Sequence, residues 1–456
     1  MISIFVMAVA MTACSSDNSN DTPSAPENTN ITVSVQPLTL NLTSDPQTAE
    51  ITINANTDWS IRTDADWVSL RPAGGVKNEN ISVKVTVTAN QEFDERVAIL
   101  DIVSGGKTVK NISLTQGYVM SASPSISSFT VGGQGTVSTI TVTSNTDWKI
   151  ETAADWLSVS PAQGGKGETK VEITAQPNRT ESDRSGNVYL LYGDSSVDIK
   201  INQLSDVVNT PEGYTLVWSD EFNEGTKPAS DWVIENQAAG WVNHELQTYT
   251  SREVDGKSTL EVKDGFLHIN CFKASDGKIY SGRMNAKPGT GWTYGYFEAR
   301  INLPSGKGTW PAFWMMPSNV DWNTNGWPKC GEIDIMEEVG VDANRVSSSL
   351  HTEKYNHTKN TQKTHEMYLA GAEGEFHTYA LEWTEDEIVT YVDGKVQLRA
   401  LKSDMGSDHE SWPFHYAFYP ILNLAWGGDW GGYAGVNENA LPVTMLVDYV
   451  RIFQKN

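Results

Sequence analysis

The densest group of chemically active side chains lies in segment 331–339, which reads Gly-Glu-Ile-Asp-Ile-Met-Glu-Glu-Val. Its alternation of polar and apolar residues is typical of a strand and places Glu332 and Asp334 on one face. A solvated strand face would alternate in the same way. However, aromatic rings beside paired carboxylates are what a site that cleaves sugar chains needs. Such rings lie just upstream, at Trp310, Trp314, Trp322 and Trp327.

Strand geometry selects the second carboxylate of the pair. In a regular strand Glu337 would face away from Glu332, whereas Glu338 would be in phase but roughly 20 Å along the strand. That is too far for the ~5–5.5 Å between the carboxyl groups of a retaining glycosidase. A bulge near Ile335-Met336 would bring Glu337 into phase and shorten the backbone separation to roughly 13 Å. We therefore predict this bulge. Asp334 would then hydrogen-bond the nucleophile, and its negative charge would favour the protonated form of the neighbouring carboxyl.

The composition excludes several classes of partner. The 456 residues contain 33 Lys and Arg against 57 Asp and Glu, a net charge of −24, which disfavours nucleic acid or a heavily sulphated glycan. The length predicts about three domains. The cysteines at positions 14, 271 and 330 cannot form a disulfide framework, and no cysteine and histidine cluster suggests zinc. All eight histidines follow residue 210, so we expect the chemistry in the C-terminal part.

The N-terminus is typical of an export signal. Ile2 to Met11 is an apolar run too short to span a bilayer, and it ends in Met11-Thr12-Ala13-Cys14, which resembles a bacterial lipobox. We predict a signal segment over 1–13, lipidation at Cys14 and a flexible tether over 14–31. The chain would then be extracytoplasmic and anchored by lipid, at the outer-membrane surface. The alternative is an ordinary cleaved signal with an incidental cysteine.

An internal repeat follows the tether. Segment 56–61 recurs at 145–150, and Asp66-Trp67 recurs as Asp155-Trp156, both at an offset of 89 residues. Alternating strands in each copy predict two small immunoglobulin-like sandwiches over 32–117 and 121–205. The pattern resembles the BACON domain, whose members were proposed to bind carbohydrate, although a spacer role is equally compatible. We interpret the repeated Trp residues as core rather than as sugar platforms: Trp59, Trp67, Trp148 and Trp156.

Residues 212–456 differ from the repeats in composition and pattern, and they read as short strands rich in aromatic residues and glycine. No sustained helical period occurs in this part. A region of this length made of strands predicts one large two-sheet sandwich, whose concave sheet can form a cleft for an extended ligand.

Residues 214–454 resemble glycoside hydrolase family 16, and in particular its laminarinase-like branch with Glu-x-Asp-x-x-Glu. Besides the carboxylate run, the matching segments are Gly240-Trp241-x-Asn243-x-Glu245-Leu246-Gln247-x-Tyr249-Thr250, Ser281-Gly282-Arg283, Trp310-Pro311-Ala312-Phe313-Trp314-Met315, His351-Thr352-x-x-Tyr355-Asn356-His357, Asn423-Leu424-Ala425 and Val447-Asp448-Tyr449-Val450-Arg451. The resemblance implies an all-β chain with a C-terminal β-jelly roll that cleaves β-1,3 or mixed-linkage β-1,3-1,4 glucans with retention.

The same resemblance implies roles for individual residues. Glu332 would be the nucleophile, Asp334 its helper and Glu337 the acid/base. No cofactor is expected for catalysis. Where many relatives have a small apolar residue after Asn-Leu-Ala, this chain has Trp426, which we include among the substrate contacts. The other implied contacts are Asn243, Arg283, Trp310, Trp314, His351 and Asn423.

Two parts of the sequence offer candidate cation ligands. The resemblance implies a structural calcium ion away from the cleft, held by Glu221, Asp448 and a backbone oxygen of Gly265. Segment 321–332 also matches the EF-hand loop pattern. We set that match aside, because Pro328 lies inside the loop and the twelfth ligand would consume the expected nucleophile.

The sequence is compatible with several other functions. A non-catalytic glucan-binding lectin would keep the tryptophans but lose the carboxyl pair, which is intact here. A family 16 hydrolase of a sulphated galactan would call for a more basic cleft. A transglycosylase shares the chemistry and differs only in its products. The sequence does not decide between laminarin and mixed-linkage glucan. We expect a monomer that has a β-glucan as its partner and contacts the membrane only through the lipid anchor.

Overall fold

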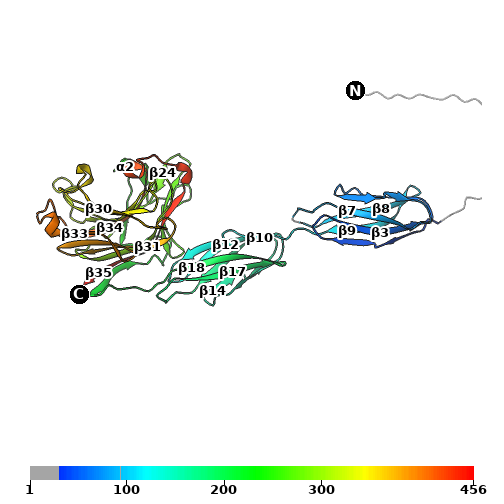
Figure 1. Cartoon of the computed structure of the whole chain (residues 1–456), viewed down its shortest axis with the longest axis horizontal. Coiled ribbons are helices and arrows are strands. Elements are labelled where there is room, and N and C mark those ends of the chain that lie inside the picture. Colours follow the sequence, from blue (N-terminus) through cyan, green and yellow to red (C-terminus); the bar gives the residue numbers. More distant parts are fainter. Residues whose placement is uncertain (1–29, 93) are drawn as a thin grey trace, which may run out of the picture. The chain divides into compact units, whose positions relative to one another are not determined.

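The computed structural model describes residues 30–92 and 94–456, so the predicted signal segment, Cys14 and nearly all of the tether lie outside the described residues. The described part is built almost entirely of strands (Figure 1), which confirms the all-β prediction. By internal contacts the chain forms two compact units, one ending at Ser121 and the other beginning at Ala122. No helix among the described residues is long and apolar enough to cross a membrane.

The first unit contains a small two-sheet sandwich. One sheet has the order β1-β3-β7-β5 and the other the order β2-β9-β8-β4-β6. Alternate residues point into the core, as the sequence pattern predicts. The strands are β1 (Val33–Gln36), β2 (Thr39–Leu42), β3 (Gln47–Ala55), β4 (Trp59–Arg62), β5 (Val68–Arg71), β6 (Gly74–Gly75), β7 (Ile81–Val87), β8 (Arg96–Ser104) and β9 (Lys107–Gln116).

The second unit begins with a sandwich of the same design. Its sheets have the orders β10-β12-β16-β14 and β11-β18-β17-β13-β15, which repeat those of the first sandwich. The strands are β10 (Ala122–Pro124), β11 (Ser128–Val131), β12 (Thr136–Ser144), β13 (Trp148–Thr152), β14 (Leu157–Ser160), β15 (Gln163–Gly164), β16 (Gly167–Ala175), β17 (Arg184–Tyr192) and β18 (Ser195–Gln203).

The repeated tryptophans lie in the cores of the two small sandwiches or pack against them. Trp59 and Trp148 are buried, and Trp156 is buried at the margin of its core. Trp67 is partly buried against the first core, and the guanidinium of Arg96 stacks on its ring at 4.2 Å. The burial of these rings agrees with the interpretation that they fill the cores.

The rest of the second unit is the large sandwich. Its ten-stranded sheet comprises β19 (Tyr214–Asp220), β21 (Gln247–Tyr249), β22 (Leu260–Lys263), β23 (Phe266–Lys273), β24 (Ile279–Ser281), β26 (Gly295–Asn302), β31 (Phe376–Trp383), β32 (Glu387–Val392), β33 (Lys395–Leu401) and β35 (Val443–Lys455). Short helices link some strands: α1 (Lys402–Met405), α2 (Gly428–Gly431), and the 3-10 turns η1 (His357–Lys359) and η2 (Glu438–Ala440).

The second sheet of the large sandwich has seven strands in the order β20-β25-β34-β27-β28-β29-β30. One face packs on the ten-stranded sheet through the main core, which includes Ile333, Ile335 and Met336 of β28. We call the opposite face the open face. The strands are β20 (Trp232–Ile234), β25 (Arg283–Ala286), β27 (Thr309–Pro317), β28 (Glu332–Glu338), β29 (Arg345–His351), β30 (Lys363–Tyr368) and β34 (Phe418–Trp426).

Candidate active site

The predicted bulge is present in β28. On the β29 side, Asp334 pairs with Ser349 and Glu337 with Ser347, so Ile335 and Met336 together oppose the single residue Ser348. The pairing with β27 shifts at the same place. The Ser348 hydroxyl donates to the carbonyl of Ile335 at 2.7 Å. Because both bulge residues point into the core, Glu337 returns to the open face that also carries Glu332 and Asp334.

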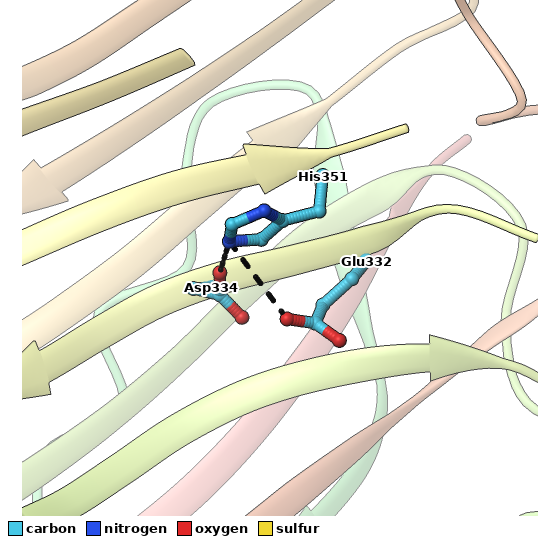
Figure 2. Close-up of side chains that lie close together, drawn as sticks. All are labelled: Glu332, Asp334 and His351. Atoms are coloured by element: carbon cyan, nitrogen blue, oxygen red, sulfur yellow. Dashed lines mark ion pairs between the residues drawn. The ribbon is translucent and has the colours of Figure 1, made fainter. Parts of the chain in front are cut away.

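His351 joins two of these carboxylates at one end of β28 (Figure 2). It pairs with Glu332 across β28 and β29, and its Nε2 lies 3.2 Å from Oδ2 of Asp334 and 3.9 Å from Oε1 of Glu332. The side chains of His351 and Asp334 are nearly enclosed, whereas that of Glu332 is 17% exposed. Asp334 is therefore enclosed beside His351, whereas the Glu332 carboxylate is accessible to a substrate.

The pKa values of the three open-face carboxyls, Glu332, Asp334 and Glu337, are all raised. Burial, followed by the charge of Asp334, raises the pKa of Glu332 well above its usual range. Burial and the charge of Glu337 raise the pKa of Asp334 well above its usual range. Burial also raises the pKa of Glu337. Crowded carboxyls with raised pKa values do not all ionise together, so the group loses its last proton at a higher pH than isolated carboxyls would.

Glu337 is held by an indole. The Nε1–H of Trp310 donates to Oε1 of Glu337 at 2.9 Å, and this hydrogen bond lowers the pKa of Glu337 against the effect of burial. Trp310 is in turn packed edge-to-face on Trp430 of α2, with ring centroids 5.6 Å apart. A single oriented carboxyl with a raised pKa is what a general acid requires.

Two of these carboxylates, together with His351, also form a group that could hold a metal ion. Ligand atoms of Glu332, Asp334 and His351 lie within 4.8 Å of one another, the one such group of three among the described residues. Exposed or clustered acids are common without a bound ion. We interpret this group as acid-base chemistry because Glu332 opens onto the same face as Glu337.

Arg283, Trp314 and Asn423 form a second wall of the open face. The Arg283 guanidinium lies 4.8 Å from the centre of the Trp314 ring and 5.1 Å from that of Trp241. The Nε1–H of Trp314 donates to Oδ1 of Asn423 at 2.7 Å. Trp241 is 45% exposed, so one ring stacked on Arg283 is available to a sugar face. The structure thus brings these predicted contacts together.

A buried polar network behind this wall was missing from our site prediction. Glu245 accepts hydrogen bonds from Gln247 at 2.7 Å and from the Tyr249 hydroxyl at 3.2 Å. The Asn423 amide donates to the Tyr249 hydroxyl at 3.3 Å. Burial raises the pKa of Glu245, whose charge in turn raises the pKa of Glu337. The alternation of polar residues at 245, 247 and 249 was a signal that would have found it.

Two other predicted contacts differ in their placement. Asn243 lies in a loop, where its side-chain amide donates to Glu245 at 3.3 Å and its backbone carbonyl accepts from the backbone N–H of Asp429 in α2. Trp426 is fully buried in the main core, so its prediction as a substrate contact is wrong. The reason is strand phase. Asn423 points to the open face, and Trp426 lies three positions further along the strand, an odd offset, so its ring points to the core.

The residues implied for calcium lie in the large sandwich with partners of their own. Both carboxylate oxygens of Glu221 accept from Arg451, at 3.0 and 2.8 Å. Asp448 is buried, which raises its pKa to about 7, and its Oδ2 lies 3.8 Å from Arg300. Gly265 has a φ of +82°. Both acidic side chains therefore have arginine neighbours, and a cation would have to share the Asp448 carboxylate with Arg300.

Comparisons with known proteins identify the large sandwich. A family model described as "Glycosyl hydrolases family 16" matches residues 243–450. A "Beta-glucanase" of Rhodothermus marinus is 40% identical over 256 residues, which span 55% of this chain and 88% of that protein. The chain belongs to glycosyl hydrolase family 16. It is therefore a glycoside hydrolase, in agreement with the predicted class of enzyme.

Other matches agree with this assignment. A "Glucan endo-1,3-beta-glucosidase" of Cryptopygus antarcticus is 36% identical and covers 48% of this chain and 83% of its own length. The solved laminarinase of Rhodothermus marinus is 39% identical with a TM-score of 0.50, over 53% of this chain and 97% of that one. Models described as "Viral BACON domain" and "Putative binding domain, N-terminal" match residues 32–118 and 146–204, so the family 16 domain is preceded by BACON domains.

Proposed function

We propose that this glycoside hydrolase is a retaining endo-β-glucanase that acts on β-1,3-linked or mixed-linkage β-1,3-1,4 glucans by double displacement. Glu332 is the nucleophile, Glu337 the acid/base, and Asp334 positions Glu332 and sets its charge. The observation that carries the proposal is the β28 bulge, which puts these carboxyls on one face with Trp310 bonded to Glu337. The names of the β-glucanase relatives support the substrate class.

In the first displacement, a Glu332 oxygen bonds to the anomeric carbon while the bond from that carbon to the leaving oxygen breaks. The proton of Glu337 passes to the leaving oxygen. In the second displacement, water gives a proton to Glu337 as its oxygen bonds to the anomeric carbon and the bond to Glu332 breaks. The first step needs Glu332 ionised and Glu337 protonated, and the second needs Glu337 ionised while Glu332 is esterified. Burial raises the pKa of Glu337, which favours the protonated form that starts the cycle.

Azide rescue tests these roles. Removing the nucleophile in Glu332→Ala opens space for azide, which should attack an activated aryl β-oligoglucoside directly and give the α-glycosyl azide. In Glu337→Ala, azide should instead attack the glycosyl-enzyme and give the β-glycosyl azide. Glu338→Ala serves as the matched control for a neighbouring carboxyl and should give no azide product. The opposite anomers, or rescue of the control, would contradict the assignment.

The linkage preference needs a separate measurement. Digestion of laminarin and of a mixed-linkage β-1,3-1,4 glucan, followed by linkage analysis of the products, separates the two substrates. Release of a range of internal oligosaccharides supports endo action, whereas release of glucose alone would contradict it. Products longer than the substrate would indicate transglycosylation.

The N-terminal part is proposed to place the catalytic domain away from a membrane. Cys14 is the proposed lipid attachment site at the outer membrane, and Cys14→Ala should move the protein from the membrane fraction to the soluble fraction. The two BACON domains are proposed as spacers, because their repeated tryptophans fill cores. Retention of residues 30–205 on insoluble β-glucan, lost when an exposed aromatic is removed, would overturn the spacer role. The active species is proposed to be a monomer.

A structural calcium ion is proposed at Asp448. The support is the resemblance of the motif around Asp448 and the burial of its carboxylate, because a buried carboxylate oxygen is a ligand that Ca²⁺ uses. A cation bound only to the folded state raises the melting temperature. We expect a chelator to lower the melting temperature and added calcium to restore it. Asp448→Asn should abolish this response, and a melting temperature that ignores both reagents would count against the site.

A further inference from the structure

The second small sandwich contacts the catalytic domain, with which it shares one compact unit. The backbone N–H of Gly132 donates to the carbonyl of Asp264 at 3.0 Å, and the Ser138 hydroxyl donates to Oδ1 of Asp264 at 2.8 Å. The guanidinium of Arg300 donates to Oδ2 of Asp183 at 2.7 Å. We call these three hydrogen bonds the docking contacts. They join one end of the small sandwich to the ten-stranded sheet.

The catalytic domain presents its side of the docking contacts on fixed elements. Asp264 and Gly265 form the two-residue turn between β22 and β23, with φ values of +55° and +82°. Such a turn favours an Asp-Gly pair, because both residues must adopt positive φ. Arg300 points away from the main core, since its neighbours Ala299 and Ile301 point into it. The catalytic carboxyls lie on the other sheet, so docking leaves the open face free.

The two backbones approach so closely that a side chain would separate them. A side-chain carbon at Gly132 would lie 2.7 Å from the carbonyl oxygen of Gly265 and 3.0 Å from its Cα. A side-chain carbon at Gly265 would lie 2.8 Å from the Cα of Gly132. Gly132 does not have a positive φ, so its own backbone would accept a side chain. The close approach of the neighbouring domain is therefore the reason for a glycine at this position.

The ion pair of the docking contacts is anchored on both sides. Oδ1 of Asp183 accepts from the backbone N–H of Ser205 at 2.9 Å, which leaves Oδ2 for Arg300. The Arg300 guanidinium also lies 3.8 Å from Oδ2 of Asp448 in β35. The Arg300 side chain is only 18% exposed. One guanidinium thus bridges carboxylates of the two domains and sets the orientation of one against the other.

The chain between the two domains begins packed on the same end of the small sandwich. The backbone N–H of Leu204 donates to Val131, and that of Asp206 donates to Asn178, both at 3.1 Å. A side-chain carbon at Gly133 would lie 2.5 Å from the backbone nitrogen of Asp206. The start of the connection is therefore held against the sandwich, which shortens the segment that could act as a hinge.

The first small sandwich lacks this set of residues. Strand bounds and register align the two repeats, because β2 matches β11, β3 matches β12, and β8 matches β17. The equivalent residues in the first repeat are Thr43 for Gly132, Ala49 for Ser138 and Glu95 for Asp183. Thr43 would bring a side chain to the point of close approach, and Ala49 has no hydroxyl to donate. The docking residues therefore distinguish the second repeat from the first.

We propose that the second BACON domain docks on the catalytic domain through these contacts, so that the two domains move as one rigid body. This inference does not depend on the reaction that the open face catalyses. A rigid joint gives the second BACON domain a role beyond distance. It fixes the direction in which the open face points relative to that domain.

Distance distributions between spin labels test the rigidity of the joint in the full chain. One label replaces exposed Lys170 in the second BACON domain, and the other replaces exposed Lys395 in the catalytic domain. Labels at Lys307 and Lys395, both in the catalytic domain, give the width expected of one rigid body. A Cys14→Ala background removes one competing thiol, and Cys271 and Cys330 are buried. We expect equal widths for the two pairs. A broad distribution for the first pair alone would overturn the proposal.

Gly132→Ala tests whether the docking contacts cause the rigidity. The added methyl group must push Gly265 away, so the distribution between the labels on the two domains should broaden at least twofold. Gly165→Ala is the matched control in the same domain, because its methyl group would meet the movable carboxylate of Asp147 at 3.0 Å. A narrow distribution that is unchanged in Gly132→Ala would show that these contacts do not hold the joint.

Thermal unfolding followed by tryptophan fluorescence gives an independent readout. Twelve of the sixteen tryptophans follow residue 210, so the signal reports mainly on the catalytic domain. A partner that binds only the folded domain stabilises it, so Gly132→Ala should lower the melting temperature of the catalytic domain by about 3 °C. Gly165→Ala should leave it unchanged. Equal melting temperatures in the unmodified protein and in Gly132→Ala would contradict docking.

Discussion

The two faces of β28 carry carboxyls that are similarly removed from water but have different surroundings. On the open face, Glu332 and Glu337 have His351 and Trp310 beside them and access to solvent. On the core face, Glu338 has no exposed surface and shares a hydrogen bond with the carboxyl of Glu373. Burial, then the charge of Glu373 and this hydrogen bond, raises the pKa of Glu338 to about 9.

This comparison shows that a raised pKa does not by itself mark a catalytic carboxyl. The open-face acids Glu332 and Glu337 each have a ring beside them, the imidazole of His351 or the indole of Trp310, and an approach for substrate. Glu338 has a second carboxyl as its partner, together with the amide of Asn344 at 3.3 Å, and no approach from outside. The core-face pair shares a proton and acts in stability rather than in chemistry.

The largest difference between the faces is expected in turnover. Glu332→Gln and Glu337→Gln keep the side-chain shape but remove the nucleophile or the acid, and activity on glucan should fall by roughly four orders of magnitude for the nucleophile. Glu338→Gln should retain activity within about tenfold. Steady-state rates of the three purified variants check this, with circular dichroism to confirm folding. A greater loss in Glu338→Gln than in Glu337→Gln would show that the bulge does not place the acid.

A smaller difference is expected in the pH profile. The indole N–H of Trp310 stabilises the charged form of Glu337 and lowers its pKa, so Trp310→Phe should raise that pKa. Because the acid must be protonated, the alkaline limb of kcat/KM should move to higher pH by about one unit. Trp412→Phe removes an indole N–H that donates to the backbone of Glu385 and serves as the control. If the alkaline limb of kcat/KM moves to lower pH in Trp310→Phe, the hydrogen bond from Trp310 does not lower the pKa of Glu337.

The smallest difference concerns stability on the core face. The folded pKa of Glu338 lies above its unfolded value, so the folded state holds a proton that the unfolded state releases between about pH 4.5 and pH 9. Stability should fall as pH rises through this window, with a slope approaching ~1.4 kcal/mol per pH unit for one proton. Glu338→Gln cannot ionise and should flatten the slope. Urea unfolding at pH 5, 7 and 8.5 checks this, and parallel curves for both proteins would exclude the shared proton.

Local spacing was enough to predict the parts of the site that lie on one strand. The phase of Glu332 and Glu337 required a bulge, and the register of β28 contains it at the expected residues. The same rule of alternation places Trp426 in the core, whereas its position after the Asn-Leu-Ala motif predicted a substrate contact. Strand phase therefore decides which face this side chain occupies, and the motif position does not.

Contacts between distant segments were beyond the sequence. Glu373 meets Glu338 only because the turn after β30 returns to the end of β28. Arg451, near the C-terminus, donates hydrogen bonds to both carboxylate oxygens of Glu221, which lies near the start of the large sandwich in the sequence. A cavity beyond the end of β28 is lined by residues of the turn after β28, of β29 and β30, and of α2 and the loop after it. No local periodicity encodes such pairings, because they depend on how the strands are ordered in the sheets.

The central claim is that Glu332 forms a covalent bond to the substrate. A 2-deoxy-2-fluoro-β-laminaribiosyl fluoride forms a glycosyl-enzyme that hydrolyses slowly, so the intermediate can be trapped, digested with pepsin and sequenced by mass spectrometry. The account predicts one added laminaribiosyl group, carried by Glu332 in the peptide around residues 331–339. A label on Asp334 or Glu337, or rapid inactivation without any covalent label, would contradict it.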